Sequence, residues 1–394
     1  MKILQVISSL NPAYGGVAAC LEALTPELAA LGHVSEAATL DAPDAPFLGA
    51  FPGTVHALGP GKFSYQYSPR LVPWLRSQMN RFDVAVVHGM WQYHGGAVHR
   101  ALRGAGAPPY FVFSHGMLDP WFKREYPLKH LKKLFYWWPV ERRVLRDAHA
   151  VLFTCEEEKI LARQSFAGYR CREQVAPIGS EGVIGDAGQQ RAAFFAHAPQ
   201  LKGNPFWLFL GRIHVKKGVD LLIEAYAALA KSGAALPPLV IAGPCKDEAL
   251  LRDLQALATA RCPAGSVHWP GMITGDVKWG ALRAAEMFVL PSHQENFGLA
   301  VVEALSCGTP VLISDKVNIW REIKADAVGL VENDDLAGTR RLLERWLQTN
   351  ASGRNTMRAA AVESFSRRYA IKAAAKNFAD ILAAGIAESR ATAA

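Results

Sequence analysis

Short apolar runs alternate with helical stretches along this chain, and that alternation limits the folds open to it. The runs at residues 2–8, 84–88, 110–114 and 150–154 are almost entirely hydrophobic, as strands covered on both faces must be. Helical spacing of apolar residues appears between them, first at 17–31. Strands that alternate with helices predict a doubly wound α/β fold with a parallel sheet.

The same order restarts in the second half of the chain. Residues 206–211 form an apolar run, 211–218 have the composition of a turn, and 219–231 have the pattern of an amphipathic helix. Further apolar runs follow at 239–243, 287–291 and 310–314. Each half therefore opens with a strand, a glycine-containing turn and a helix, as two copies of one architecture would.

The stretch from 179 to 203 lacks strand patterning and is rich in Gly, Ala and Gln, which predicts a link between two domains. We expect an N-terminal Rossmann-like domain over residues 1–185 and a C-terminal one over 200–365. The alanine-rich helical stretch at about 366–394 is expected to pack back on the first domain. Because doubly wound folds bind ligands at the carboxyl ends of their strands, the residues directly after each strand are the functional candidates.

Charge and cysteine content narrow the classes of function. The chain has 43 Lys and Arg against 35 Asp and Glu, a net charge of +8 that favours anionic partners such as nucleotide diphosphates, lipid surfaces or nucleic acid. Its six cysteines show neither C-x-x-C nor zinc-finger spacing, which predicts free thiols in a reducing cytoplasm. No apolar run approaches the ~20 residues that span a bilayer. We expect a cytoplasmic protein, or one peripheral on the inner face of the cytoplasmic membrane.

The most informative segment is PSHQENFGLAVVEALSCGTPVLIS, at residues 291–314. A strand ends near its start, a polar loop carries Glu295 and Asn296, and a helix begins around Gly298. Free backbone N–H groups at a helix start suit a phosphate, and glycine lets a ligand approach the backbone closely. Glu303 lies one to two turns into the helix, where a carboxylate can accept both hydroxyls of a ribose. Glu295, before the helix, can face a sugar.

This segment resembles the hallmark of glycosyltransferase family 4, the glycosyl transferases group 1. The shared features are two glutamates with seven residues between them, FGL after the first, and Ala with Gly-Thr-Pro-Val after the second. The resemblance extends to GRIHVKKGVDLLIEAY at 211–226, to the opening strand with its Gly-Gly turn, and to Ser-His-Gly at 114–116. It implies the GT-B fold, two Rossmann-like domains facing across a cleft, and retaining transfer of a hexose from a nucleotide-diphosphate sugar.

The resemblance places Arg212 and Lys217 at the donor diphosphate. Negative charge develops on that leaving group as the glycosidic bond breaks, and something must neutralise it. Metal-dependent transferases use a cation held by Asp-x-Asp, a triplet that this sequence lacks. A planar guanidinium and an ammonium can supply the positive charge instead, so we expect neither a metal nor a cofactor besides the donor.

The resemblance also assigns the remaining site residues. Glu295 contacts the donor sugar, and the loop with Gly15 and Gly16 offers backbone N–H groups to the phosphate and the acceptor side. The catalytic candidates are His115, Arg212, Lys217 and Glu295. The donor-binding candidates are Gly15, Gly16, Arg212, Lys217, Gly271, Ile273, Glu295, Asn296, Phe297, Gly298, Leu299 and Glu303. The family often has an acid after the histidine, whereas Gly116 follows His115 here.

One further segment, residues 121–146, mixes Lys and Arg with aromatic residues at helical spacing. Such a helix can lie on an anionic bilayer with its aromatics among the headgroups, or it can pack its aromatics inward and solvate its lysines. The first interpretation favours a lipid-linked saccharide acceptor. The candidates for acceptor or membrane contact are His88, Lys129, Lys132, Lys133 and Trp137. No nucleic-acid-binding module accompanies the basic residues, so we expect no nucleic-acid partner.

Together these features predict a retaining, metal-independent hexosyltransferase in cell-surface polysaccharide synthesis, of exopolysaccharide or lipopolysaccharide. Its acceptor is expected to be a saccharide or a lipid-linked saccharide. GDP-mannose is the first expectation for the donor, ahead of UDP-linked sugars. Two alternatives stay open: a nucleotide-sugar 2-epimerase, which can share the fold, and a catalytically inactive family member that binds the donor.

Overall fold

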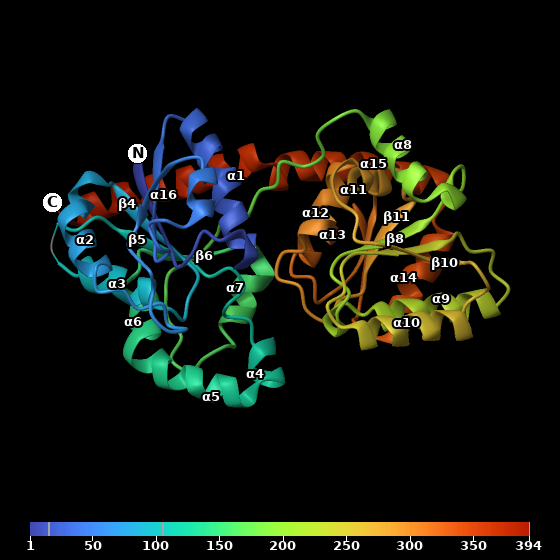
Figure 1. Cartoon of the computed structure of the whole chain (residues 1–394), viewed down its shortest axis with the longest axis horizontal. Helices are drawn as coiled ribbons and strands as arrows, with labels where there is room; N and C mark the ends of the chain where they lie inside the picture. Colours follow the sequence, from blue (N-terminus) through green and yellow to red (C-terminus); the bar gives the residue numbers. More distant parts are fainter. Residues whose placement is uncertain (15, 105, 394) are drawn as a thin grey trace. The chain divides into compact units, whose positions relative to one another are not determined.

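The computed structural model describes residues 1–14, 16–104 and 106–393, and it divides into two compact units. The first unit comprises Met1–Gly179 and Ile371–Ala394, and the second comprises Ser180–Ala370. Each unit is built on one sheet whose strands all run parallel (Figure 1). The predicted fold class of two doubly wound α/β domains is confirmed.

The first sheet has the strand order β3-β2-β1-β4-β5-β6-β7. Its strands are β1 (Lys2–Ile7), β2 (Val34–Thr39), β3 (Thr54–Ala57), β4 (Val84–His88), β5 (Tyr110–Phe113), β6 (Ala150–Phe153) and β7 (Glu173–Val175). The chain builds outward from β1 to β3, then returns to pair β4 with β1 and continues in the other direction. The gap beyond the carboxyl ends of β1 and β4 is therefore the switch point, where doubly wound sheets bind ligands.

Helices cover both faces of this sheet (Figure 1). They are α1 (Gly16–Ala30), α2 (Leu71–Gln78), α3 (Tyr93–Ala101), α4 (Trp121–Glu125), α5 (Pro127–Tyr136), α6 (Arg142–Asp147), α7 (Glu156–Ala162) and α16 (Ile371–Ala393). Phe111 and Phe113 of β5 pack with apolar side chains of α1 and α16. Val112, between them, packs on the other face with α2, α3 and α6. That alternation is the strand period of two, with both faces buried.

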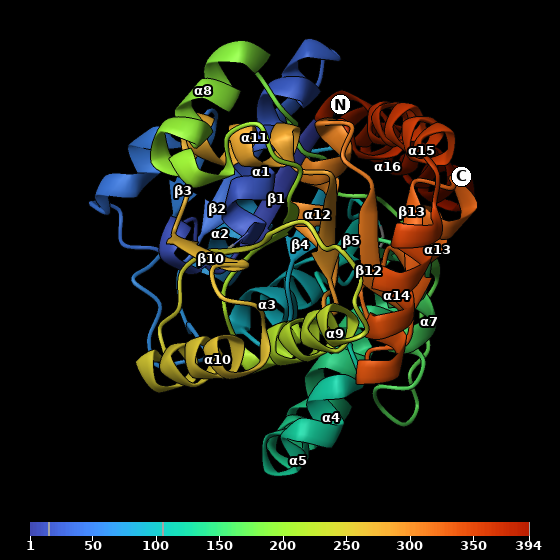
Figure 2. The same cartoon turned by 90° about the vertical axis from the view of Figure 1, so that its right-hand side faces the viewer.

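The second sheet has the order β10-β9-β8-β11-β12-β13, so its switch point lies between β8 and β11. Its strands are β8 (Trp207–Leu210), β9 (Leu239–Ala242), β10 (Val267–Gly271), β11 (Met287–Leu290), β12 (Val311–Ser314) and β13 (Gly329–Glu332). Its helices are α8 (Ala187–His197), α9 (Val219–Lys231), α10 (Glu248–Arg261), α11 (Gly275–Ala284), α12 (Leu299–Ser306), α13 (Trp320–Ala325), α14 (Leu336–Gln348) and α15 (Ala351–Ser364). Helices α8 and α11 pack together on one face, and α9 packs with α10 and α14 on the other (Figure 2).

Strand β2 shows why the apolar runs did not reveal every strand. Its Glu36 is buried inside the first unit with 5% exposure. The carboxylate is 2.7 Å from His56 Nε2 and 3.3 Å from Lys2 Nζ. Because these partners satisfy the buried charge, a strand on the inside of the domain can carry a residue that breaks the hydrophobic pattern.

Candidate functional site

The turn after β8 approaches the loop after β11 very closely. Gly218 closes that turn with φ +62°, and a Cβ on it would lie 2.2 Å from the Pro291 carbonyl oxygen. Lys216 and Lys217 lie just before it, in a short 3-10 turn over Val215–Lys217. Only glycine adopts this positive φ without a clash between its Cβ and the Pro291 carbonyl oxygen. Because Gly218 brings the two loops this close, the two lysines before it lie beside the loop after β11.

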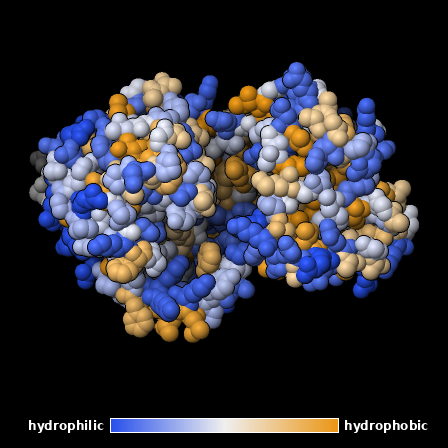
Figure 3. Space-filling model, viewed as in Figure 1, coloured by the Kyte–Doolittle hydropathy of each residue, from blue (hydrophilic) through white to orange (hydrophobic). Residues whose placement is uncertain are grey.

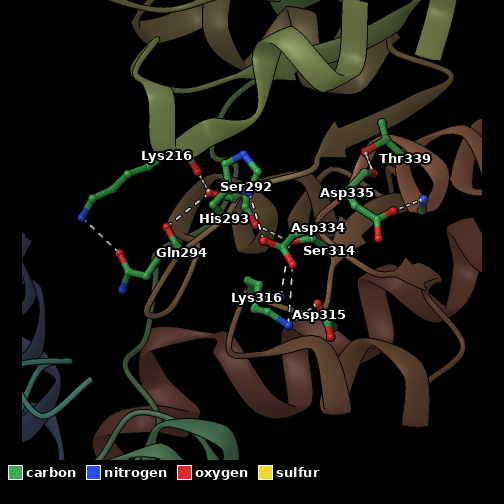
Figure 4. A network of polar contacts seen from close by, with 11 residues as sticks. Lys216, Ser292, His293, Gln294, Ser314, Asp315, Lys316, Asp334, Asp335 and Thr339 are labelled. Carbon is green, nitrogen blue, oxygen red and sulfur yellow. Dashed lines mark hydrogen bonds and ion pairs between the residues drawn. The ribbon is translucent and has the colours of Figure 1, made fainter. Parts of the chain in front are cut away.

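Hydrogen bonds join the two loops at the switch point (Figure 4). The Lys216 carbonyl oxygen accepts from the His293 backbone N–H at 2.7 Å and from the Ser292 hydroxyl at 2.8 Å. Lys216 Nζ lies 3.4 Å from Gln294 Oε1. These contacts hold the loop before Glu295 against the turn that carries the lysines.

A second set of contacts fixes the same loop from the side of β12 and β13 (Figure 4). His293 Nδ1 lies 3.0 Å from Asp334, and Lys316 Nζ lies 3.7 Å from the same carboxyl group. The Glu295 backbone N–H donates to the Lys316 carbonyl oxygen at 2.9 Å, and its own carbonyl accepts from Asn318 at 3.0 Å. The backbone of Glu295 is thus held on both sides before any ligand binds.

Lys217 Nζ forms an ion pair with the Glu295 carboxylate, although 78 residues separate them in sequence. Burial, together with the smaller effect of the charges of Arg212 and Lys216, lowers the pKa of Lys217 to about 8. The carboxylate of Glu295 acts in the opposite direction, since it favours the charged ammonium. The pair is mostly shielded from water, with side-chain exposures of 16% for Lys217 and 25% for Glu295.

Arg212 is exposed directly after β8, close enough for its charge to act on Lys217. Because the Arg212 side chain is exposed, a ligand can reach its guanidinium donors. No three His, Cys, Asp or Glu side chains of residues 1–14, 16–104 and 106–393 lie close enough together to hold a metal ion. The structure therefore brings together three of the four catalytic candidates, Arg212, Lys217 and Glu295.

Helix α12 begins beside this group. Gly298 adopts φ +76°, and Leu299 at the first helical position is 52% exposed. Phe297 is different: its ring is 6% exposed and packs edge-on against Tyr369, with 5.8 Å between the centroids. The ring of Phe297 thus has a packing role, and donor contact through its backbone N–H stays a prediction. Asn296 is 3.5 Å from Asn318, through their amide groups.

Glu303, the expected ribose ligand, has a partner that the sequence did not suggest. Its Oε1 lies 2.8 Å from Lys278 Nζ of α11, and both side chains are largely buried. The two remaining donor candidates lie at the end of β10, where Gly271 is exposed with φ +74° and Ile273 is 6% exposed. Lys278 had no sequence signal, because a pair 25 residues apart depends on how α11 and α12 pack.

In the first unit, His88 is the last residue of β4 and His115 follows β5. The two side chains contact each other, with His88 Nδ1 3.0 Å from His115 Nε2. His88 Nε2 lies 2.7 Å from Gln5 Oε1, and Gln5 Nε2 donates to Ser35. Because Gln5 Oε1 can only accept, His88 donates to Gln5 through Nε2 and accepts from His115 through Nδ1. Burial lowers the pKa of His115 to about 3 and that of His88 well below its usual value, so both rings are neutral at pH 7.

A cavity of about 320 Å³ opens beside these histidines at the switch point of the first sheet. It is lined by Ser8, Ser9 and Asn11 after β1, and by His88 and Gln92 after β4, among others. Gly16 begins α1, and a Cβ on it would meet open space. Gly15, the other glycine of the predicted phosphate turn, lies outside the described residues.

Glu158 is the functional candidate that sequence reasoning missed in this unit. Its carboxylate is 2% exposed and accepts four hydrogen bonds, two from Thr154 and one each from Ser114 and Gly116, all at 2.6–2.7 Å. It therefore fixes the turn on both sides of His115, which itself has φ +47°. The local signal was a threonine at a strand end followed by glutamates at a helix start, the composition of an N-terminal cap.

The structure corrects part of the prediction for residues 121–146. Trp137 is fully buried and its indole donates to the Ala167 carbonyl at 2.9 Å, so its assignment to membrane or acceptor contact is wrong. Lys133 is half-buried with its ammonium 4.4 Å from the Trp91 ring, so it too faces the domain. Lys129 and Lys132 are exposed. No helix in the described part of the chain has the length and apolar character needed to cross a bilayer.

Comparisons with solved structures agree with the fold. A glycosyltransferase from Rickettsia africae superposes with a TM-score of 0.74 at 12% identity, covering 98% of each chain. Anabaena HepE, solved in complex with UDP and glucose, gives 0.70 at 16% identity, covering 98% of this chain and all of that one. At such identities the likeness concerns the fold alone, which is GT-B.

Sequence comparisons cover both units. D-inositol 3-phosphate glycosyltransferase of Salinispora tropica is 32% identical over 188 residues, 46% of this chain and 39% of the relative. Phosphatidyl-myo-inositol mannosyltransferase of Mycolicibacterium smegmatis is 34% identical over 191 residues, 46% of this chain and 47% of the relative. The matches thus span less than half of these curated relatives.

Residues 15–179 match the glycosyl transferase 4-like domain, and residues 190–363 match the family described as glycosyl transferases group 1. By these two matches the chain belongs to the glycosyl transferases group 1 family of glycosyltransferases.

Proposed function

We propose that this protein is a retaining, metal-independent glycosyltransferase that moves a hexose from a nucleotide-diphosphate sugar to a saccharide or lipid-linked saccharide. One observation carries the proposal: Arg212, Lys217 and Glu295 meet at the switch point of the second sheet. The Arg212 guanidinium and the Lys217 ammonium can bind a diphosphate there, and the neighbouring Glu295 carboxylate can accept hydrogen bonds from sugar hydroxyls. The position is the one at which doubly wound sheets bind nucleotides.

The ion pair between Lys217 and Glu295 suggests how the donor binds. In the ligand-free protein each group neutralises the other. A diphosphate brings negative charge to Lys217 and Arg212, and the Glu295 carboxylate is then released to accept hydrogen bonds from the sugar. Because the backbone of both loops is already fixed, only side chains need to move, and little entropy is lost on binding.

The chemistry follows from charge. As the bond between the anomeric carbon and the diphosphate oxygen breaks, Arg212 and Lys217 stabilise the negative charge on the leaving group. The acceptor hydroxyl attacks the oxocarbenium-like carbon from the same face, and the departing phosphate takes its proton, so the configuration is retained. The neutral His115, held by His88, can offer a lone pair or its neighbouring backbone to the sugar without adding charge.

Glu303 and Lys278 are proposed to form the ribose site. Lys278 occupies one carboxylate oxygen of Glu303. The other oxygen is left for a ribose hydroxyl. The expected base site, at Gly271 and Ile273, lies at the end of the edge strand β10.

The relatives support a cell-surface setting for the acceptor. Their names describe transfer to inositol 3-phosphate and to phosphatidyl-myo-inositol, and WaaG, a fold neighbour with a TM-score of 0.63, is described as involved in lipopolysaccharide biosynthesis. We propose polysaccharide synthesis in the cytoplasm, or at the inner face of its membrane. The mannosyltransferase favours GDP-mannose as donor, and the UDP complexes of HepE make UDP-linked sugars the second candidate.

Nucleotides are expected to stabilise the protein against heat in the order GDP, UDP, ADP. A ligand that binds only the folded state at a hundredfold excess over its Kd adds ~2.7 kcal/mol, a rise in melting temperature of about 5–10 °C for a unit of this size. A thermal-shift assay with the three diphosphates measures this directly. UDP giving the largest shift would replace guanosine by uridine in the proposal, and no shift with any of them would contradict a nucleotide site.

Replacing Glu295 by alanine is expected to lower kcat/KM for sugar transfer by about 10²-fold, since a contact made in the transition state is lost. The GDP-induced shift should persist, because the phosphate ligands remain. Glu344→Ala, a surface glutamate of α14 paired with Arg340, is the matched control. Unchanged transfer by Glu295→Ala would contradict the assignment.

The alternatives give different products in the same assay. Conversion of the donor sugar to its 2-epimer in the absence of acceptor would show an epimerase. Nucleotide binding by the wild type without turnover of any donor would show an inactive family member.

A further inference from the structure

Helix α5 and the turn after it present an apolar face to solvent. Leu128 and Phe135 are each 78% exposed, Leu131 is 53% exposed and Trp138 is 50% exposed. The spacing of three and four residues places Leu128, Leu131 and Phe135 on one side of α5, and Trp138 follows in the next turn. In Figure 1, α5 lies beyond α3 and α6, on the side away from the sheet of the first unit. Figure 3 shows apolar atoms beside hydrophilic ones at that end of the unit.

The opposite face of the same helix is held inside the domain, which fixes the orientation of the exposed one. Tyr136 Oη lies 2.7 Å from Tyr65 Oη, and the Trp137 indole donates to Ala167. Lys133 lies 4.4 Å over the ring of Trp91. A rotation that hid Leu131 and Phe135 would break all three contacts, so the outward apolar face is a fixed feature of the fold.

Positive charge surrounds this face. Lys123, Arg124, Lys129 and Lys132 are exposed within or beside it. Over residues 121–146 there are eight Lys and Arg against two Glu. One of those two, Glu141, is 1% exposed and accepts from the Trp91 backbone N–H at 2.6 Å, so it does not offset the surface charge.

We infer that this face docks on a lipid bilayer that carries anionic headgroups. The apolar side chains can enter the boundary between headgroups and acyl chains while the lysines and Arg124 contact the anionic headgroups above them. A second copy of this chain would present the same positive charge and be repelled. A nucleic acid would satisfy the charge and leave the four apolar side chains in water. A bilayer matches both properties, and this inference does not depend on the proposed sugar transfer.

The test is co-sedimentation with vesicles of phosphatidylglycerol and phosphatidylcholine, compared with vesicles of phosphatidylcholine alone. Wild-type protein should bind the vesicles that contain phosphatidylglycerol, dissociate from them at high salt, and bind the vesicles of phosphatidylcholine alone weakly. Each lysine near an anionic surface is worth about a fivefold change in partitioning, so Lys129→Glu/Lys132→Glu should bind at least about 25-fold more weakly. Leu131→Ser/Phe135→Ser should lose more than about tenfold, even at low salt.

Matched controls separate the face from net charge and from folding. Lys202→Glu/Lys372→Glu makes the same charge change at exposed positions elsewhere, and Leu31→Ser removes an apolar side chain that is 43% exposed at the end of α1. Both controls should bind vesicles as the wild type does. All variants should keep the wild-type nucleotide-induced melting shift, so a failure of the nucleotide site would be visible separately.

Three outcomes would overturn the inference. The first is an equal loss of vesicle binding in Lys202→Glu/Lys372→Glu and in Lys129→Glu/Lys132→Glu. The second is equal binding of the wild type to both kinds of vesicle. The third is binding of the wild type to RNA without binding to vesicles.

Discussion

Lys217→Met will lower kcat/KM for the nucleotide-sugar donor by about 10²–10³-fold, the usual effect of removing one preorganised group that stabilises transition-state charge. Lys217 is largely buried beside Glu295 and close to Arg212, so its charge acts where water screens it little. Initial rates over a range of donor concentrations give the constant.

The matched control for this prediction is Lys216→Met. Lys216 lies in the same turn, and its Nζ lies 3.4 Å from the Gln294 side chain. Its essential contribution is the carbonyl oxygen that joins the two loops, which the substitution keeps. We expect this variant to retain most of the wild-type rate. Equal losses in the two variants would show that the turn, and not the Lys217 ammonium, is what matters.

Lys217 also predicts the pH dependence of the wild type. Burial lowers the pKa of Lys217 to about 8, so the ammonium is present below that pH and lost as the pH rises through it. Since kcat/KM reports groups of the free enzyme, its alkaline limb should fall near pH 8, or somewhat higher where Glu295 retains the proton. Lys217→Arg keeps its charge throughout this range and should remove the limb. A limb that is unchanged in Lys217→Arg would assign it to another group.

The order of strands and turns could be predicted from the sequence because parallel strands buried on both faces are nearly continuous apolar runs. The predicted helix at 219–231 coincides with α9 (Val219–Lys231). Strand β2 escaped notice because its Glu36 is buried with its charge satisfied by residues distant in sequence. Local pattern thus reveals a strand only where burial is achieved with apolar side chains alone.

In the candidate site too, the sequence pointed to single residues but not to the contacts between distant parts of the chain. The family resemblance pointed to Lys217, Glu295 and Glu303 as separate positions. Their pairing, Lys217 with Glu295 and Glu303 with Lys278, depends on how distant loops and helices pack. In residues 121–146 helical spacing could not show which face turns inward, because a π-helical turn over Trp137–Glu141 changes the register there. Trp137 was therefore predicted to be outside and is inside.

Replacing Glu158 by alanine is expected to be the most destabilising of these changes. The carboxylate accepts hydrogen bonds from two backbone N–H groups and two hydroxyls in a dry interior. Each donor left unsatisfied costs about 1–3 kcal/mol. We expect the free energy of unfolding to fall by about 3–5 kcal/mol after partial relaxation, with the melting transition of the first unit lower by about 10 °C. Calorimetry of the whole chain measures both.

Glu156→Ala is the control for this prediction, because Glu156 lies in the same helical turn and pairs with Lys159 at 2.7 Å near the surface. Such pairs are worth under about 1 kcal/mol, so its melting temperature should change little. Glu158→Gln separates stability from positioning. An amide keeps one acceptor oxygen but turns an NH₂ group toward donors on its other side, which disturbs the turn around His115 without leaving a cavity. If that turn positions the sugar, Glu158→Gln loses transfer rate at temperatures where it remains folded and still binds nucleotide. If transfer stays intact while stability falls, Glu158 supports the domain and has no part in the reaction.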